Sequence, residues 1–161
     1  MSLIAELLPI EHVVVDFDAS SKKRVFEQAG LLFENNLGIA RSDVFDSLFS
    51  RERLGSTGLG QGIAIPHGRI KGLQKAAGAF FRLKNPVQFD APDGQPVNML
   101  FVLLVPEQAN QQHLQLLSEL AQMFSDAAIC ARLETAPTEA EVHEIFTTWT
   151  PNATDQRRAA V

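Results

Sequence analysis

Apolar residues along the chain alternate between the spacing of helices and the spacing of strands. Residues 3–8 form a short apolar segment that ends before Pro9, and residues 12–17 are rich in β-branched side chains. These segments predict a short helix followed by a strand. Two longer helices are predicted next, with inward positions Val25, Ala29, Leu32 and Phe33 in one, and Val44, Phe45, Leu48 and Phe49 in the other.

Polar residues at the ends of these two helices have the character of caps. Ser20 or Ser21 is expected to cap the first helix. That helix is expected to end at residues 36–38, the last of which is a glycine. Ser42 is expected to cap the second helix, since a serine hydroxyl can accept a hydrogen bond from a free amide of the first turn.

The middle of the chain predicts strands. Residues 63–66, 76–83 and 97–105 are apolar and rich in residues that favour strands. The last of these runs would be apolar on both faces of a strand, which indicates a strand covered on both sides. Pro86 and residues 92–96 predict turns between the last two strands.

The C-terminal part of the chain is predicted to be helical. Residues 108–124 predict a long helix and residues 127–133 a shorter one, while Thr138 and Glu141 have the spacing of a capping box for a last helix. The core-facing stripe of the long helix is expected to comprise Leu114, Leu117, Ala121 and Phe124.

Strands that alternate with helices predict one α/β domain over residues 3–149, with a mixed β-sheet flanked by helices on both faces. The sheet is expected to be mixed because some connections are too short for parallel crossovers. Residues 150–161 carry almost no large apolar side chains, so they are expected to form a disordered tail.

Composition excludes several classes of function. The chain has 161 residues and a net charge of −5, and it lacks a basic cluster of the kind that nucleic-acid binding needs. Its longest apolar run is far shorter than the ~20 residues of a membrane helix, and its N-terminus lacks the basic start of a secretory signal. A cytoplasmic location without membrane insertion is expected. Cys130 lies among apolar residues and is expected to be a buried, inert thiol.

Residues 55–69 hold the densest candidate chemistry, because they combine glycines, two hydroxyls and a histidine. The run lacks the Lys-Ser/Thr of a nucleotide-binding P-loop. It also leaves a helix and opens a strand, which is the reverse of a dinucleotide-binding turn. Neither nucleotide motif is therefore indicated.

His67 at the end of this run could accept a phosphoryl group, because a neutral imidazole nitrogen is a nucleophile near neutral pH. Glycine amides and the hydroxyls of Ser56 and Thr57 could donate hydrogen bonds to phosphoryl oxygens. Pro66 favours an extended backbone before the histidine, and Gly68 is expected to leave room for a macromolecular donor. The alternative is a structural histidine at a strand end.

The motif Gly-Ser-Thr-Gly-x-Gly-x-Gly-Ile-Ala-Ile-Pro-His-Gly at residues 55–68 resembles the phosphorylation site of enzyme IIA proteins of the phosphotransferase system, fructose and mannitol type. The nitrogen-related branch of that family is the most similar. Segments at residues 50–52, 86–90, 103–106 and 113–117 extend the resemblance over nearly the whole chain. The resemblance implies a mixed sheet flanked by helices.

The resemblance also implies the roles of individual residues. It places the phosphorylated Nε2 on His67, and it makes His113 and Arg51 active-site residues. Phosphoryl-binding roles fall on the hydroxyl turn of Ser56, Thr57 and Gly58. Asn110 is a good helix cap that would put His113 in the first turn of its helix.

Alternatives stay open for most of these side chains. His113 could be an exposed polar residue, and Arg51 could be a solvated cation at a helix end, as Arg53 is expected to be. His12 and His143 are expected to be bystanders. Asp90 and Asp93 are expected to support turns, and neither a metal site nor a cofactor is expected.

Three functions follow from these residues and the resemblance. The leading hypothesis is a phosphocarrier that receives its phosphoryl group from a histidine-containing carrier protein and regulates targets such as potassium-transport components or sensor kinases. The second is a sugar-specific subunit that passes phosphate to a permease. The third is a binding module that carries no phosphate.

Overall fold

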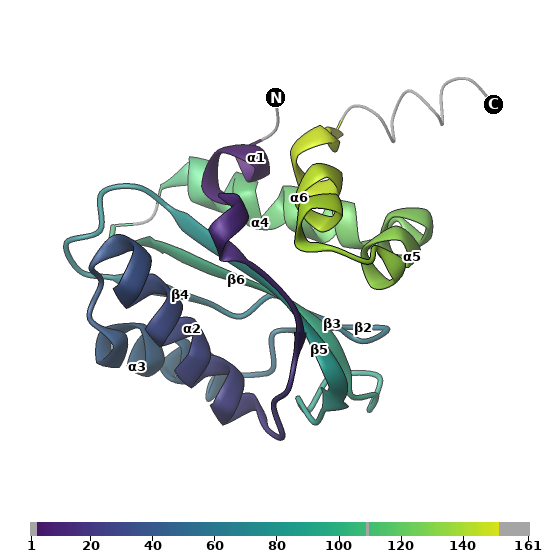
Figure 1. The fold of residues 1–161 in the computed structure, drawn as a ribbon. Helices are drawn as coiled ribbons and strands as arrows, with labels where there is room; N and C mark the ends of the chain where they lie inside the picture. The colour runs from purple at the N-terminus through teal and green to yellow at the C-terminus, as the bar shows by residue number, and fades with distance from the viewer. Residues whose placement is uncertain (1–2, 109, 152–161) are drawn as a thin grey trace.

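The computed structural model describes residues 3–108 and 110–151, and six strands form a single mixed sheet at its centre (Figure 1). The strands follow the order β1-β5-β6-β3-β2, and β4 pairs with β6 beyond the end of β3. Strand β5 runs antiparallel to β6, whereas β3 and β4 run parallel to it. The strands are β1 (Val13–Phe17), β2 (Gly58–Gly60), β3 (Ile63–Ala64), β4 (His67–Ile70), β5 (Ala77–Val87) and β6 (Val97–Pro106).

Helices cover both faces of this sheet (Figure 1). Helices α2 (Lys22–Leu37) and α3 (Arg41–Glu52) lie on one face. The other face carries α1 (Leu3–Leu7), α4 (Gln111–Phe124), α5 (Ala127–Thr135) and α6 (Glu139–Thr148), with a short 3-10 helix (Ile10–His12) before β1. The prediction of an α/β fold with a mixed, doubly covered sheet is confirmed.

Strand β6 explains why the sheet is covered twice. Its side chains alternate between two hydrophobic cores, because successive side chains of a strand point to opposite faces. Met99, Phe101, Leu103 and Val105 join the core beneath α1, α4, α5 and α6. The intervening Leu100, Val102 and Leu104 join the core beneath α2 and α3.

Two predicted helix features are confirmed and one is wrong. Ser21 caps α2, since its hydroxyl accepts a hydrogen bond from the amide of Arg24 at 3.1 Å, and Gly38 ends the helix with a φ of 71°. Ser42 does not cap α3. That helix begins at Arg41, whose amide donates to a carboxylate oxygen of Glu34 on α2 at 2.9 Å. An acceptor from a neighbouring helix thus replaces the local serine.

The predicted stripe of α4 is wrong at Leu114 and Ala121, both of which are exposed. Leu114 is 65% exposed, whereas Leu116, Leu120 and Met123 are buried. The apolar arc of this helix is wide enough for either stripe, and its packing on the sheet selects the second. Leu114 is thereby left at the surface beside β4.

Strand β5 also runs further than predicted. Pro86 lies inside it rather than in a turn. The pairing of β5 with β6 is interrupted between Arg82 and Val87, so a proline, which has no amide to donate, is tolerated there.

Two further expectations concern the ends of the chain and its helices. The predicted tail falls mostly on residues 152–161, which lie outside the described residues. Within residues 3–108 and 110–151, no helix combines the length and apolar character needed to cross a membrane.

Candidate active site

A pocket of about 500 Å³ lies at the free edge of β4, between α3 and α4. His67 reaches it from β4, His113 from the first turn of α4, and Arg51 from the last turn of α3. The structure therefore brings together the three side chains that the sequence analysis selected from distant parts of the chain. The apolar side chains Leu54, Leu114 and Leu117 complete the wall that faces solvent.

The backbone around β4 holds His67 at this edge. His67 lies opposite Leu103 in the register with β6, and the Leu103 amide donates to the Pro66 carbonyl at 2.9 Å. Gly68 permits the close approach of α3, because a Cβ at this position would lie 3.0 Å from Cβ of Ser47 and overlap its hydroxyl. The space beside Gly68 is thus occupied by Ser47 of α3, which corrects the expectation that Gly68 leaves room for a donor protein.

Hydrogen bonding selects the tautomer of His67. Its Nδ1 lies 2.9 Å from the carbonyl oxygen of Ile65. A carbonyl can only accept, so Nδ1 carries the proton and donates it. In the neutral ring Nε2 then keeps its lone pair, and Nε2 is the nitrogen available for nucleophilic attack.

The electrostatic surroundings keep this ring neutral. Burial lowers the pKa of His67 below its model-compound value of 6.5, and the positive charge of Arg51 lowers it further. The hydrogen bond to Ile65 and the negative charge of Glu52 act in the opposite direction but do not overcome burial. The nucleophilic form of the imidazole is therefore the main form at neutral pH.

His113 has the opposite arrangement of its ring nitrogens. Its Nδ1 accepts a hydrogen bond from the Asn110 amide at 2.9 Å, while the Asn110 side chain accepts from the amides of Gln112 and His113. This reciprocal pattern is a capping box, and it confirms Asn110 as the cap. Because Nδ1 is an acceptor, the neutral ring carries its proton on Nε2. His113 can therefore donate a hydrogen bond from Nε2.

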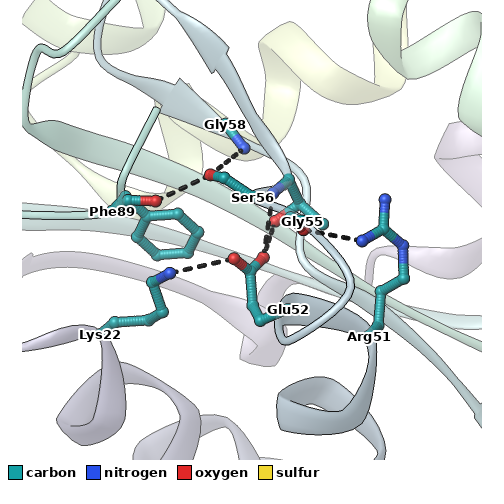
Figure 2. A network of polar contacts seen from close by, with 8 residues as sticks. Lys22, Arg51, Glu52, Gly55, Ser56, Gly58 and Phe89 are labelled. Carbon is teal, nitrogen blue, oxygen red and sulfur yellow. Dashed lines mark hydrogen bonds and ion pairs between the residues drawn. The ribbon is translucent and has the colours of Figure 1, made fainter. Parts of the chain in front are cut away.

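Arg51 lies at the end of α3 and uses one of its donors locally. Its Nη1 donates to the carbonyl oxygen of Gly55 at 2.8 Å (Figure 2). A guanidinium has five N–H donors in a planar fork, so further donors remain for an anion in the pocket. The ring of His67, the ring of His113 and the guanidinium of Arg51 thus surround one space.

The hydroxyl turn does not join this arrangement. The Ser56 hydroxyl donates to the Phe89 carbonyl at 2.7 Å, and the Gly58 amide donates back to that hydroxyl (Figure 2). The amide and the hydroxyl of Thr57 both donate to the Glu52 carboxylate. None of these three turn residues is among those that line the pocket. The geometry therefore gives no support to their expected role as phosphoryl ligands.

Glu52 and Lys22 belong to this neighbourhood but were missed by the sequence analysis. The Glu52 carboxylate is 3% exposed and lies 3.0 Å from Nζ of Lys22 (Figure 2). The signals in the sequence are that Glu52 follows Arg51 directly and that it ends the segment 50–52 of the family resemblance. The pairing with a residue thirty positions away cannot be read from spacing.

The remaining candidate residues make contacts that are typical of structural roles. His12 is buried, with Nδ1 2.8 Å from the Gly78 carbonyl, and Nε2 of His143 lies 2.9 Å from the Leu8 carbonyl. Asp93 accepts from the amide of Gln95 in its own loop and from the amide of Gln61 between β2 and β3, in keeping with support of turns. Burial raises the pKa of the Cys130 thiol, which disfavours its reactive thiolate.

Within the described ranges, no three histidine, cysteine, aspartate or glutamate side chains are grouped as a metal ion would require. Arg53 ends α3 with an exposed side chain, in keeping with a solvated cation.

Comparisons with known proteins identify the family of this chain. Residues 6–149 match the family described as "Phosphoenolpyruvate-dependent sugar phosphotransferase system, EIIA 2". A nitrogen regulatory protein of Pseudomonas aeruginosa is 44% identical over 146 residues, which span 90% of this chain and 95% of that protein.

Solved structures extend the likeness to three dimensions. The nitrogen regulatory protein IIA-Ntr of Neisseria meningitidis superimposes with a TM-score of 0.86 at 55% identity, over 91% of this chain and 100% of that one. The mannitol-specific IIA protein of Escherichia coli shares the fold, with a TM-score of 0.73 at 23% identity over 86% of this chain and 97% of its own. The chain therefore belongs to the type-2 EIIA family of the phosphotransferase system, in the branch of the nitrogen regulatory IIA proteins.

Proposed function

We propose that this protein is a cytoplasmic phosphocarrier that accepts a phosphoryl group on Nε2 of His67 and regulates other proteins according to its phosphorylation state. One observation carries the proposal. The Nδ1 proton of His67 is donated to the Ile65 carbonyl, so the nitrogen with the free lone pair is Nε2, in a pocket shared with Arg51 and His113.

The proposed donor is a histidine-containing carrier protein in its phosphorylated form. Nε2 of His67 attacks the phosphorus atom as the donor's P–N bond breaks, and the electron pair of that bond returns to the donor's ring nitrogen. Such transfers pass through a loose transition state whose charge lies on the phosphoryl oxygens. Positioning and charge stabilisation therefore supply most of the catalysis.

Three groups around the His67 ring have a defined task in this step. The Ile65 carbonyl holds the Nδ1 proton and stabilises the positive charge that the His67 ring gains when Nε2 bonds to phosphorus. The guanidinium of Arg51 and the Nε2–H of His113 supply donors to the phosphoryl oxygens. Transfer of the phosphoryl group from His67 to an acceptor would use the same three groups in the reverse direction.

Regulation would follow from the charge that the pocket gains. Phosphorylation adds about −1.5 to −2 charge at pH 7. The rim that receives this charge carries Leu54, which is 84% exposed, and Leu114. A partner that docks on the apolar rim would bind the two forms differently. Potassium-transport components and sensor kinases are the targets that the family resemblance suggests.

A sugar-specific subunit is the second candidate, since the chemistry at His67 would be the same. An E. coli mannitol-specific IIA protein of this fold forms a complex with a phosphorylated IIB protein. The identity of this chain to the nitrogen regulatory proteins, 44% and 55%, favours the regulatory assignment.

A labelling assay tests the proposal. The protein is incubated with enzyme I, the histidine-containing carrier and phosphoenolpyruvate, alongside His67→Ala. We expect an acid-labile, alkali-stable adduct on the wild type and none on the variant, whose circular dichroism stays unchanged. A folded wild-type protein that gains no phosphoryl group would refute the proposal and leave a binding module. Transfer onward to a IIB protein of a sugar permease would favour the second candidate.

A further inference from the structure

We propose that Glu52 is a positioning residue for phosphoryl transfer, because its buried carboxylate holds the loop to which the guanidinium of Arg51 is bound. The inference rests on the proposed function for its kinetic consequence. Its structural content stands on the contacts of the Glu52 clasp, which comprises Lys22, Glu52 and Thr57.

The clasp joins three segments of the chain around one carboxylate. One oxygen of Glu52 lies 3.0 Å from Nζ of Lys22, at the start of α2. The other oxygen accepts the amide of Thr57 at 3.1 Å and also its hydroxyl. Figure 2 shows the carboxylate between the lysine and the turn. Both oxygens of this buried anion therefore have partners.

The clasp closes the loop that carries the partner of Arg51. Residues 53–56 connect Glu52 to Thr57, and the Gly55 amide donates to the Glu52 carbonyl at 3.1 Å. The Gly55 carbonyl faces Nη1 of Arg51 at 2.8 Å. Since this carbonyl lies between the two ends of the clasp, its place depends on the bond between Glu52 and Thr57.

Burial argues that the carboxylate serves more than stability. Glu52 and Lys22 have side chains only 3% and 18% exposed, and removing water from an ion pair costs about as much as the pair regains. A well-packed apolar pair would hold the helices as firmly. An ion pair with added hydrogen bonds instead fixes one orientation, and here that orientation belongs to the loop beside the pocket.

The position of Arg51 matters because the guanidinium must meet phosphoryl oxygens in the transition state. A displacement of about 1 Å in a positioned group can slow a reaction about a hundredfold. Between the two ends of the clasp, the loop is exposed to solvent at Arg53, Leu54 and Gly55. Without the clasp the loop would keep the Ser56 bond to Phe89 but lose its bond at Thr57.

The test is a double-mutant cycle of the transfer rate from the phosphorylated carrier to His67. We expect Glu52→Gln to slow the maximal rate by about tenfold in the wild type, with little change in the carrier concentration at half-maximal rate. In the Arg51→Ala background the same substitution should slow the rate by less than about twofold, because residues that act through one another are not additive. Equal slowing in both backgrounds would overturn the proposal.

Two further variants guard against a general loss of structure. Glu119→Gln removes a carboxyl of similar burial, 4% exposed, on α4, and it should leave the rate within about twofold of the wild type. A slowing equal to that of Glu52→Gln would contradict a specific role. Thr57→Val removes one bond of the clasp and keeps its ion pair, so it decides the matter by the same cycle if Glu52→Gln fails to fold.

A spectroscopic measurement separates this inference from the proposed function. The Nη–H resonances of Arg51 in the unphosphorylated protein should differ from those of free arginine, because Nη1 donates to the Gly55 carbonyl, and they should move toward the free values in Glu52→Gln. This result is expected even if His67 accepts no phosphoryl group. An Arg51 resonance that is identical in the wild type and in Glu52→Gln would overturn the clasp itself.

Discussion

Gly68→Ala should destabilise the protein, because the methyl group has no space between β4 and α3. The new Cβ would overlap the Ser47 hydroxyl and lie 3.0 Å from Ser47 Cβ and 3.1 Å from the Ser47 carbonyl carbon. Rotation of the hydroxyl relieves only the first contact. The backbone contact remains, so α3 must move away from the sheet.

The magnitude follows from two terms. Overpacking of this kind costs about 1–3 kcal/mol. Rotation of the Ser47 hydroxyl also breaks its 2.8 Å hydrogen bond to the Arg69 carbonyl, which costs about 1 kcal/mol. The sum is about 2–4 kcal/mol in the free energy of unfolding, and for a domain of this size it lowers Tm by about 4–16 °C.

Differential scanning calorimetry of four proteins provides the assay: the wild type, Ser47→Ala, Gly68→Ala and the double variant. Ser47→Ala alone should lose only the hydrogen bond, about 1 kcal/mol. In its presence Gly68→Ala should cost less than in the wild type, because the overlapping oxygen is gone. A Tm of Gly68→Ala within 1–2 °C of the wild type (about 0.5 kcal/mol), or fully additive costs, would refute the packing argument.

Two other perturbations probe the pocket directly. Arg51→Ala removes a positive charge that lowers the pKa of His67, so NMR titration of the ring should give a higher pKa, and the acid limb of the transfer rate should move to higher pH; an unchanged or lower pKa would contradict the electrostatic reasoning. His113→Ala removes the bond that the Asn110 amide donates to Nδ1 and the donor on Nε2, so it should cost about 1 kcal/mol of stability and slow transfer about 100–1000-fold. His113→Gln should recover the stability, because glutamine suits this position of a capping box, but not the rate; recovery of both would show that the ring acts only as a cap.

The pH dependence of stability has a definite sign. The pKa of His67 is lower in the folded state than the ordinary value of 6.5, so the unfolded chain binds the proton more readily. The contribution of this residue is therefore full above pH 6.5 and is lost as the pH falls from there through the folded-state pKa. The same shift lets the folded protein keep the His67 ring neutral to a lower pH than the unfolded chain does.

Much of the fold could be predicted from short-range patterns. The apolar run of β6 predicts a strand covered on both sides because alternate side chains enter two cores. Ser21, Gly38 and Asn110 act as helix ends through bonds to residues within four positions. Patterns of this kind are local, and a local pattern is visible in the sequence.

The wrong predictions involve contacts between segments that are distant in the sequence. The cap of α3 is the carboxylate of Glu34 on another helix, so the preference of Ser42 had no effect. Ser56 and Thr57 have the right groups for a phosphoryl ligand, but Phe89 and Glu52 bind their hydroxyls. Side-chain chemistry predicts what a group can bind, whereas the tertiary fold decides which partner reaches it first.

The pocket itself was partly predictable for a similar reason. His67, His113 and Arg51 are distant in sequence and were selected by motif resemblance, and the fold gathers them around one space. The tautomers of the two rings depend on Ile65 and Asn110. Those bonds leave a lone pair on Nε2 of His67 and a proton on Nε2 of His113, and no pattern in the sequence predicts them.

The nitrogen that bears phosphorus is the most direct test of the proposed chemistry. The protein is labelled with ¹⁵N-histidine, charged through the carrier, and studied by ³¹P–¹⁵N NMR. We expect coupling of phosphorus to Nε2 of His67, with Nδ1 of the same ring still engaged with the Ile65 carbonyl. Coupling to Nδ1 of His67, or to a ring nitrogen of His113, would contradict the tautomer on which the proposed mechanism depends.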